Sequence, residues 1–503
     1  MAFAVEDGLQ FELPSTEAAT ILRQSLPDLP INRQALVRAR LRLLTGFAQL
    51  WVRFWNASGA EISGAHQWSA PSASPSADWQ ILEFDVVVPE ETRSAAAGLF
   101  FGGDVHSTIA ECEFRLVDDD IDAYLRRLVD KVAKEIPDLP RDCREAFLST
   151  PRHLFLPDVA PATAYLDDAI PTRWGEEDGV RVAISSSSQP TMMAIMLRDL
   201  DLKSGMRVLE IGTGTGYNAA ILARIVGAEN VTSIDIDPEI VATALANLDR
   251  AGLTGIDARV ADGWLGLPDR APFDRIIVTV GVADIPPAWF DQLADDGAIV
   301  MPLSFQCAEY SVAFRKFGDR LKSTAVRICR FMDLRGNNAR ISYHRRDGWQ
   351  IKHDSLTDVE AAEIASILAL PSTALAIPPE ANNGPILADY LVMRHWPTVE
   401  VSGPATTALD QSEAAIVHAV VDLDRRGAAT PRASMGDPVA AEALRRLSTE
   451  WADLRRSGVD RIRLTAYPRS EHVARPRIRS TAARGVFEKP NNWIAWEFYA
   501  SRG

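Results

Sequence analysis

The middle of the chain alternates short β-branched runs with longer segments of helical hydrophobic periodicity. Residues 121–136 place apolar side chains on one helical face, and the prolines at 137 and 140 end that pattern. Five later runs indicate buried strands, at 205–211, 229–235, 257–262, 273–282 and 297–303. A helix is expected between the second and third runs, with Asp237 as its N-cap and Pro238 at its first position. This alternation predicts a parallel, doubly wound α/β sheet.

Different patterns flank this region. Residues 1–118 contain short alternating, aromatic-rich runs separated by Ser/Pro/Gly segments, which predicts an antiparallel β-sandwich. We interpret its tryptophans at 51, 55, 68 and 79 as core residues, with stacking on a sugar as the alternative.

The last third of the sequence gives mixed signals. Helical patterns occur at 357–369 and 437–457, and strand-like runs occur at 459–466 and 484–500. Three regions are therefore expected: a sandwich over 1–118, an α/β core over 119–330 and an α+β region over 331–503.

The most informative segment is a glycine-rich turn between two of the predicted core strands. The first strand ends at Glu210-Ile211, and Gly212, Gly214 and Gly216 follow before a helical stretch. Such a turn lets a ligand approach the backbone, and the next helix presents its positive end to that ligand. The second strand ends on Asp235, where a carboxylate can accept hydrogen bonds from ribose hydroxyls. The pattern predicts a nucleoside-bearing cofactor, although a tight turn without a ligand would use similar glycines.

The details of the turn select among cofactors. A dinucleotide fingerprint requires glycine where this chain has Tyr217, and Glu210 would repel a pyrophosphate. No Gly-Lys-Ser/Thr follows, which excludes a P-loop. A carboxylate is compatible with a sulfonium, so we expect S-adenosyl-L-methionine.

The composition of the chain argues against nucleic acid, metal and membrane as partners. The 503 residues carry a net charge of −15, which disfavours nucleic acid as a partner. The four cysteines have no metal-ligand spacing and are expected to be reduced thiols, and we expect no metal. Neither a secretory signal pattern nor an 18-residue apolar run occurs, so we expect no membrane association and a cytoplasmic location.

Residues about 122–305 resemble the protein-L-isoaspartate O-methyltransferase family. The matching segments are Ala146-Phe147, Pro151 to Pro157 (PRHLFLP), Tyr165 to Asp167, Ile170-Pro171, Ser188-Gln189-Pro190, Gly205 to Gly216, Asp262-Gly263, Ala271 to Asp274 and Val278-Thr279. The resemblance implies a Rossmann-like S-adenosyl-L-methionine methyltransferase core that acts on an Asp or isoAsp carboxylate in a peptide or protein.

The resemblance also implies roles for individual residues. Ser188 becomes the candidate catalytic residue, because its hydroxyl can orient a carboxylate that is already ionised at neutral pH. The implied cofactor-binding residues are Gln189, Glu210, Gly212, Thr213, Gly214, Gly216, Tyr217, Asp235, Ile236, Asp262, Gly263 and Thr279. Among them, Asp235 is assigned to the ribose, and Asp262 with Gly263 to the adenine. We interpret His153 as structural and Asp167 as a loop anchor rather than a base.

The chain departs from the family pattern in the loop that lies over the substrate in the family. Residues 174–190, WGEEDGVRVAISSSSQP, are longer and richer in serine there. This loop and the flanking regions resemble actinobacterial relatives that methylate an aspartate in a ribosomal peptide precursor, after which the ester closes to an aspartimide. General repair of isoaspartyl proteins is the alternative, and a non-catalytic binder with this fold is a third reading.

Overall fold

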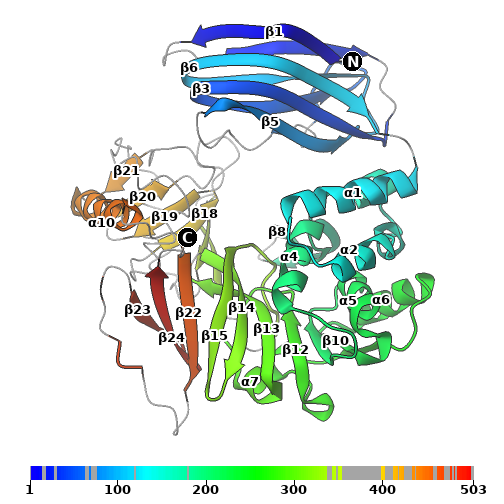
Figure 1. The fold of residues 1–503 in the computed structure, drawn as a ribbon, viewed down its shortest axis with the longest axis vertical. Coiled ribbons are helices and arrows are strands. Elements are labelled where there is room, and N and C mark those ends of the chain that lie inside the picture. Colours follow the sequence, from blue (N-terminus) through cyan, green and yellow to red (C-terminus); the bar gives the residue numbers. More distant parts are fainter. Residues whose placement is uncertain are drawn as a thin grey trace. The chain divides into compact units, whose positions relative to one another are not determined.

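The computed structural model describes most of the chain (Figure 1). The described residues are 2–13, 19–27, 31–62, 67–68, 76–117, 120–177, 180–306, 308–336, 342–346, 349–353, 398–402, 412–416, 419–423, 433–436, 438–456, 461–469, 476–478, 481 and 484–499. The expected helix at 357–369 lies outside them.

Internal contacts divide the chain into two units. The first contains Met1–Lys134, Pro151–Asp168 and Arg426–Ala428, and the second contains the remaining segments Glu135–Thr150, Ala169–Arg425 and Ala429–Gly503. The units and the three regions expected from the sequence therefore do not share boundaries.

The first unit is built on antiparallel strands. They are β1 (Ala2–Leu13), β2 (Ala19–Pro27), β3 (Gln34–Trp55), β4 (Gln67–Trp68), β5 (Ser76–Val87) and β6 (Ser94–Leu116). β1 and β2 pair with different halves of β6, while β5 and β4 pair with different parts of β3. Buried positions alternate along β3 up to Leu43 and resume out of phase at Ala48, because register shifts interrupt its pairing with β6 there.

Helical segments complete the first unit. They are α1 (Ile121–Glu135), the 3-10 turn η1 (Arg152–Phe155) and α3 (Pro161–Ala164). Arg127 of α1 donates from Nε to Oδ1 of Asp85 on β5 at 2.9 Å, and Lys134 pairs with Glu83 on the same strand. α1 is therefore anchored to the β-sheet by charged side chains.

The second unit contains a ten-stranded sheet with the order β11-β10-β9-β12-β13-β14-β15-β22-β24-β23 (Figure 1). Its parallel strands are β9 (Val208–Ile211), β10 (Val231–Asp235), β11 (Asp257–Val260), β12 (Phe273–Val278) and β13 (Leu293–Phe305). The strand order reverses between β9 and β12, and ligands bind at the carboxyl edge of such a reversal. The predicted doubly wound α/β core is confirmed.

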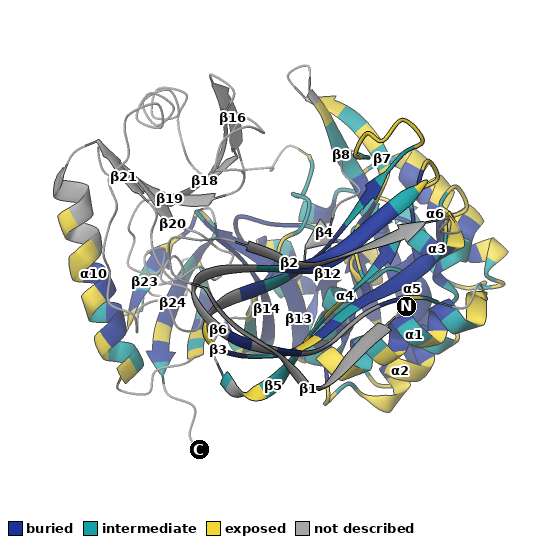
Figure 2. Cartoon of the chain, turned by 90° about the horizontal axis from the view of Figure 1, so that it is seen from above, coloured by how far each residue is buried: buried dark blue, intermediate teal, exposed yellow. Residues whose placement is uncertain are grey.

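Helices connect and flank these strands. They are α2 (Arg141–Leu148), α4 (Pro190–Leu200), α5 (Tyr217–Val226), α6 (Pro238–Arg250), α7 (Pro287–Gln292) and the short turns η2 (Ala228–Asn230), η3 (Gly263–Leu265) and η4 (Pro268–Arg270). Figure 2 shows exposed residues along one side of α2 and α6. As predicted, Asp237 caps α6, accepting from the backbone N–H of Glu239 and of Ile240.

The antiparallel end of this sheet includes strands from far along the chain. β14 (Ala308–Phe317) and β15 (Arg320–Ile328) are followed by β22 (Arg461–Pro468), β24 (Asn492–Tyr499) and β23 (Arg484–Glu488). Trp496 and Phe498 of β24 belong to the same buried cluster as the parallel strands, together with Trp451 of α10 (Pro438–Arg456). The region after residue 330 thus shares a sheet and a core with the α/β region.

Two smaller sheets complete the described part of the second unit. One contains β16 (Ser342–Arg346), β17 (Trp349–His353), β18 (Thr398–Ser402), β19 (Ser412–Ile416), β20 (Ala419–Leu423) and β21 (Ala433–Gly436). The other is a hairpin of β7 (Ile170–Glu177) and β8 (Val180–Ser187).

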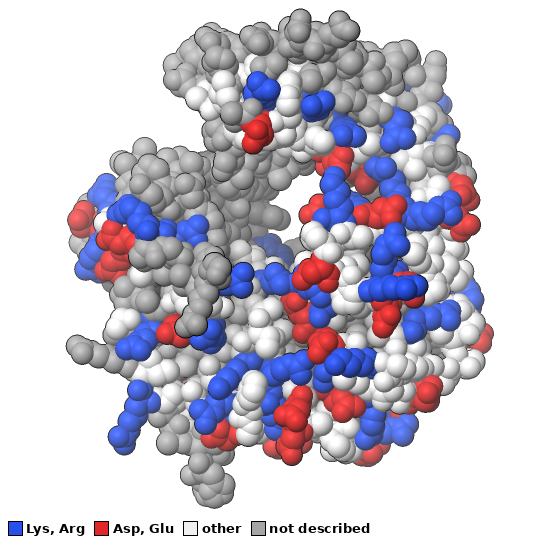
Figure 3. Space-filling view, viewed as in Figure 1, with Lys and Arg blue, Asp and Glu red and all other residues white. Residues whose placement is uncertain are grey.

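Charged side chains of both signs intermix over the face displayed in Figure 3. Many of the charged side chains form ion pairs, such as Arg259 with Asp257 and Arg198 with Asp199. Among the described residues, none of the helices combines the length and apolar character needed to cross a membrane.

Candidate active site

The glycine-rich turn joins β9 to α5 at the carboxyl edge of the parallel strands. Its three glycines have positive φ angles, +100° at Gly212, +53° at Gly214 and +82° at Gly216. A Cβ built on Gly212 would lie 2.5 Å from Oγ1 of Thr279 and 3.2 Å from Val280. The turn therefore requires glycine at position 212 both for its conformation and for the close approach of β12.

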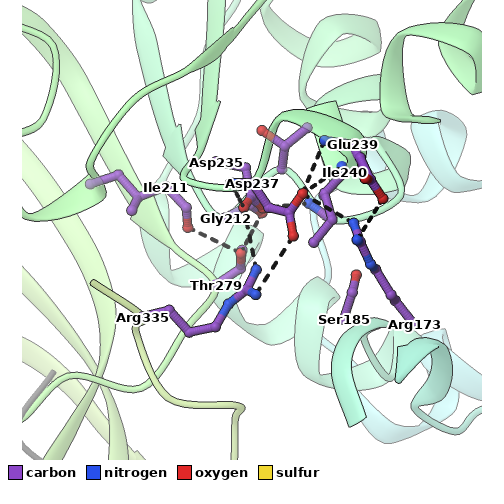
Figure 4. Close-up of polar contacts among 12 residues, drawn as sticks. Arg173, Ser185, Ile211, Gly212, Asp235, Asp237, Glu239, Ile240, Thr279 and Arg335 are labelled. Carbon is purple, nitrogen blue, oxygen red and sulfur yellow. Dashed lines mark hydrogen bonds and ion pairs between the residues drawn. The ribbon is translucent and has the colours of Figure 1, made fainter. Parts of the chain in front are cut away.

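Thr279 holds the ends of two neighbouring strands together. Its hydroxyl lies 2.8 Å from the carbonyl oxygen of Gly212 and 3.1 Å from that of Ile211, and its backbone N–H donates to Ile211 at 2.9 Å (Figure 4). A predicted cofactor residue thus lies directly against the turn.

Glu210 lies beneath the turn with no exposed surface. Its two carboxylate oxygens accept from Asn218 Nδ2 at 2.7 Å and from Ser233 Oγ at 2.5 Å, and Ser233 also lies 2.8 Å from Oγ1 of Thr213. Burial raises the pKa of Glu210 to about 7, against the effect of these two hydrogen bonds. Glu210 and Thr213 therefore brace the turn from inside, and a direct contact between Glu210 and cofactor stays a prediction.

Tyr217 begins α5 and is also buried. Its ring packs edge-on against Phe147 of α2, with ring centroids 6.3 Å apart. This predicted cofactor residue contributes to the core behind the turn.

Asp235 ends β10 beside the turn. Its Oδ2 accepts from the backbone N–H of Gly214 at 3.3 Å, and its Oδ1 accepts from that of Asp237 at 3.2 Å. Each carboxylate oxygen has a second lone pair, so Asp235 can still accept hydrogen bonds from a diol. Burial raises the pKa of Asp235, and the backbone donors oppose that effect.

The loop after β11 brings the predicted adenine residues, Asp262 and Gly263, to the same edge. Asp262 accepts from the N–H of Trp264 at 2.9 Å, and a Cβ on Gly263 would lie 2.6 Å from the side chain of Ile211. A Cβ on Gly336 would lie 3.0 Å from Ile236 and 3.8 Å from Asp262. Ile236, 36% exposed, and Asp262 are therefore close to one another in space.

Ser188 and Gln189 follow the β7–β8 hairpin and precede α4. Ser188 is half-buried and Gln189 is exposed at the N-cap of α4. A Cβ built on Gly214 would lie 3.4 Å from the carbonyl oxygen of Ser186. The end of the hairpin, two residues before Ser188, is thus in contact distance of the glycine turn.

The β7–β8 hairpin also pairs with two acidic residues that follow Asp235 in the sequence. Arg173 of β7 donates to Oδ1 of Asp237 at 3.0 Å and to Oε2 of Glu239 at 2.5 Å (Figure 4). Arg335 approaches the same group of carboxylates, 3.8 Å from Asp235 and 3.7 Å from Asp237. Nothing in the local sequence pattern marks Arg173, Arg335, Asn218 or Ser233 as residues of this site.

The Pro-Arg-His segment belongs to the first unit, where its residues have structural partners. The fully buried Arg152 donates to the carbonyl oxygens of Ala164, Leu166 and Asp168. Nδ1 of His153 lies 2.8 Å from the hydroxyl of Tyr165, and burial lowers the pKa of His153. Asp167 pairs with Lys131 at 3.9 Å. These contacts agree with the structural interpretation of His153 and Asp167.

Comparison with known proteins finds a family over the region that contains this edge of the sheet. The family model "Protein-L-isoaspartate(D-aspartate) O-methyltransferase (PCMT)" matches residues 126–339. Protein-L-isoaspartate O-methyltransferase 1 of Syntrophobacter fumaroxidans is 39% identical to the chain over 192 residues, which are 85% of that protein and 38% of this chain. The chain belongs to the protein-L-isoaspartate O-methyltransferase family.

Further matches cover a slightly larger share of the chain. The protein-L-isoaspartate O-methyltransferase of Hyperthermus butylicus is 36% identical over 221 residues, 88% of that protein and 42% of this chain. A solved family structure from Plasmodium falciparum, in complex with S-adenosyl-L-homocysteine, superposes with a TM-score of 0.36 and 19% identity, covering 42% of this chain and 99% of that one. As a member of the protein-L-isoaspartate O-methyltransferase family, the chain is a protein carboxyl O-methyltransferase, and its cofactor is S-adenosyl-L-methionine.

Proposed function

We propose that this protein-L-isoaspartate-type methyltransferase modifies an aspartate or isoaspartate carboxylate in one defined peptide, in the manner of a peptide-tailoring enzyme. The observation that carries the proposal is the β7–β8 hairpin, which occupies the segment where the sequence departs from the repair pattern. Trp174 on this hairpin is 47% exposed, and the guanidinium of Arg181 stacks 4.4 Å from its ring centroid. An exposed, rigid aromatic beside a cation is suited to hold a peptide.

The region after residue 330 supports the same proposal. β22 pairs with β15 through Leu321 with Ala466 and Lys322 with Thr465, so this region extends the catalytic sheet. Strands that share a core with the transferase keep a fixed place beside it. Such strands can supply binding contacts for a particular partner, which a general repair enzyme does not need.

The residues at the carboxyl edge fit the cofactor. In this proposal, the backbone of Gly212, Gly214 and Gly216 follows its methionine portion, Asp235 accepts from the ribose hydroxyls, and Asp262 with Gly263 borders the adenine. The other proposed cofactor residues either contact the cofactor or lie behind the residues that do. They are Gln189, Thr213, Tyr217, Ile236, Thr279 and Glu210. Bound there, S-adenosyl-L-methionine supplies a methyl group on a positively charged sulfur.

The chain's own groups have to orient the acceptor. A side-chain carboxylate is ionised at neutral pH, so no general base is needed. We assign to the Ser188 hydroxyl a hydrogen bond to one carboxylate oxygen, which leaves the other oxygen to form the bond to the methyl carbon as the carbon–sulfur bond breaks. In the resulting ester, the backbone nitrogen of the next residue can attack the carbonyl carbon, and methanol leaves as the aspartimide closes.

The deciding experiment is a methylation assay followed by mass spectrometry. It compares unrelated isoaspartyl peptides, their aspartyl counterparts and short peptides encoded beside the gene of this protein. A tailoring enzyme should strongly favour one encoded peptide, which first gains a methyl ester and ends lighter than the starting peptide by one water. Equal and efficient use of unrelated isoaspartyl peptides would instead establish the alternative, general isoaspartyl repair.

Substitution of Trp174 tests the hairpin separately. Trp174→Ala should raise KM for the preferred peptide with little change in cofactor affinity, because remote contacts contribute binding rather than chemistry. Phe317→Ala is the matched control, since Phe317 is 51% exposed and is also stacked by a cation, Lys322. Equal effects of the two substitutions would show that the hairpin takes no part in substrate recognition.

A further inference from the structure

A short segment after β15 crosses the carboxyl edge of the sheet. The backbone N–H of Gly281 donates to Met332 at 2.8 Å, and that of Leu334 donates back to Gly281 at 2.8 Å. A Cβ on Gly263 would lie 3.3 Å from Cδ1 of Leu334. We refer to Met332–Gly336 as the covering segment, because it runs from the end of β12 across the proposed adenine residue Gly263.

The covering segment ends beside the proposed ribose and adenine residues. Arg335 approaches the carboxylates of Asp235 and Asp237 (Figure 4). A Cβ on Gly336 would lie close to Ile236 and Asp262. The closeness of Gly336 to Ile236 leaves little room for a side chain at position 336. The segment therefore follows the nucleoside end of the cofactor site over several consecutive residues.

We propose that Arg335 is a positioning residue for the nucleoside end of the cofactor, holding the covering segment in place and supplying the positive charge beside Asp235 and Asp237. This inference rests on the proposed role of Asp235 in binding ribose. It adds a residue that acts on the cofactor through another residue's carboxylate.

The distances allow the charge of Arg335 to act on Asp235 without displacing the ribose hydroxyls that Asp235 is proposed to bind. Arg335 lies 3.8 Å from Oδ1 of Asp235, which is beyond hydrogen-bonding distance. The carboxylate therefore keeps lone pairs for ribose hydroxyls while it interacts with the guanidinium. Asp235 is mostly buried, with 11% of its side chain exposed, so the interaction is weakly screened at that end.

Asp235 lies among other acidic groups, so it needs the positive charge of Arg335 to remain ionised. Asp237 on the same turn and Glu210 on β9 repel the negative charge of Asp235, whereas Arg335 attracts it. Arg173 pairs with Asp237 and Glu239 instead. The backbone N–H groups of Gly214 and Asp237 also stabilise the carboxylate of Asp235. Burial raises the pKa of Asp235 and Arg335 lowers it, so removal of Arg335 should favour the protonated acid, which is a poorer acceptor.

The test measures binding of S-adenosyl-L-homocysteine by calorimetry between pH 5 and pH 8. Arg335→Gln should weaken binding about fivefold at pH 7, and the pH at which affinity falls on the acid side should move up. Arg335→Lys should restore most of the affinity and the wild-type pH profile. Arg320→Gln is the matched control, because Arg320 is as exposed as Arg335 and pairs with an acid, Asp319, at the opposite end of β14 from the site, and it should bind like the wild type.

Each outcome separates a positioning role from a structural one. Unchanged binding in Arg335→Gln would overturn the proposal. So would weaker binding with an unmoved acid limb and no rescue by lysine, which is the signature of packing alone. The effect of Arg335→Gln should also disappear in an Asp235→Asn background, and full additivity of the two changes would count against it. Failure of the wild type itself to bind would refute the proposed cofactor site rather than the role of Arg335 alone.

Discussion

Asn218 donates a hydrogen bond of 2.7 Å from Nδ2 to Oε1 of Glu210, across the glycine turn that separates them. Glu210 is the penultimate residue of β9, and Asn218 lies in the first turn of the following helix. The bond joins strand and helix beneath the backbone that we assign to the cofactor. With Ser233 on the other carboxylate oxygen, it holds the turn in one conformation before any ligand arrives.

Asp235→Ala should weaken cofactor binding. The lost hydrogen bonds from ribose to a charged acceptor contribute about 1.5–3 kcal/mol, or roughly a 10- to 150-fold increase in Kd. Calorimetry with S-adenosyl-L-homocysteine measures the change. Asp249→Ala, which removes an exposed acid of α6, serves as the control, and equal affinities in the two variants would refute the ribose assignment.

Ser188→Ala should keep cofactor affinity but lower the rate of methylation at saturating peptide, because the acceptor carboxylate loses its orienting donor. We expect a loss of roughly tenfold or more in kcat, equivalent to about 1.4 kcal/mol of transition-state stabilisation. Ser204→Ala, at an exposed loop serine, should behave as the wild type. An unchanged kcat in Ser188→Ala would make Ser188 a structural residue.

Gly212→Ala and Gly205→Ala form a matched pair. Both positions have positive φ, +100° and +82°, so each substitution introduces about 1–2 kcal/mol of backbone strain. Nothing lies within 4 Å of a Cβ at Gly205, whereas a Cβ at Gly212 meets Thr279. We expect cofactor binding to be lost only in Gly212→Ala, as measured by calorimetry, with a larger decrease in Tm. Similar losses in both variants would mean that strain alone governs the turn.

Glu210 should make stability depend on pH in an unusual direction. Burial raises its pKa from 4.5 to about 7, so between these values the folded protein holds the proton that the unfolded chain releases. Stability is therefore lost as pH rises through this window, by on the order of 3 kcal/mol. Glu210→Gln removes this titration.

Chemical unfolding at pH 5 and pH 8 measures the effect of Glu210. The variant should gain stability relative to the wild type on going from pH 5 to pH 8. Glu229→Gln, at an exposed acid, should follow the wild type at both pH values. A constant difference between Glu210→Gln and the wild type would show that Glu210 is ionised throughout.

Several features of the site could be predicted because their causes are local. A turn that needs positive φ selects glycine at 212, 214 and 216, and a helix start selects Asp237-Pro238. Strands buried on both faces are recognisable as apolar runs, which located β9, β10 and β12. Because parallel strands end at one edge, Asp235 at the end of β10 and Thr279 directly after β12 lie at the same edge of the sheet.

The sequence by itself therefore determined the α/β core, the glycine turn, the family and its cofactor, since each depends on residue types at fixed short spacings. Only the tertiary structure decided that β22 and β24 extend the catalytic sheet, that Ser233 and Asn218 hold Glu210, and that Arg173 and Arg335 meet at Asp237. A strand edge or a guanidinium can pair with many partners of similar chemistry. Which partner it meets is set by how distant segments pack, and no local pattern records that.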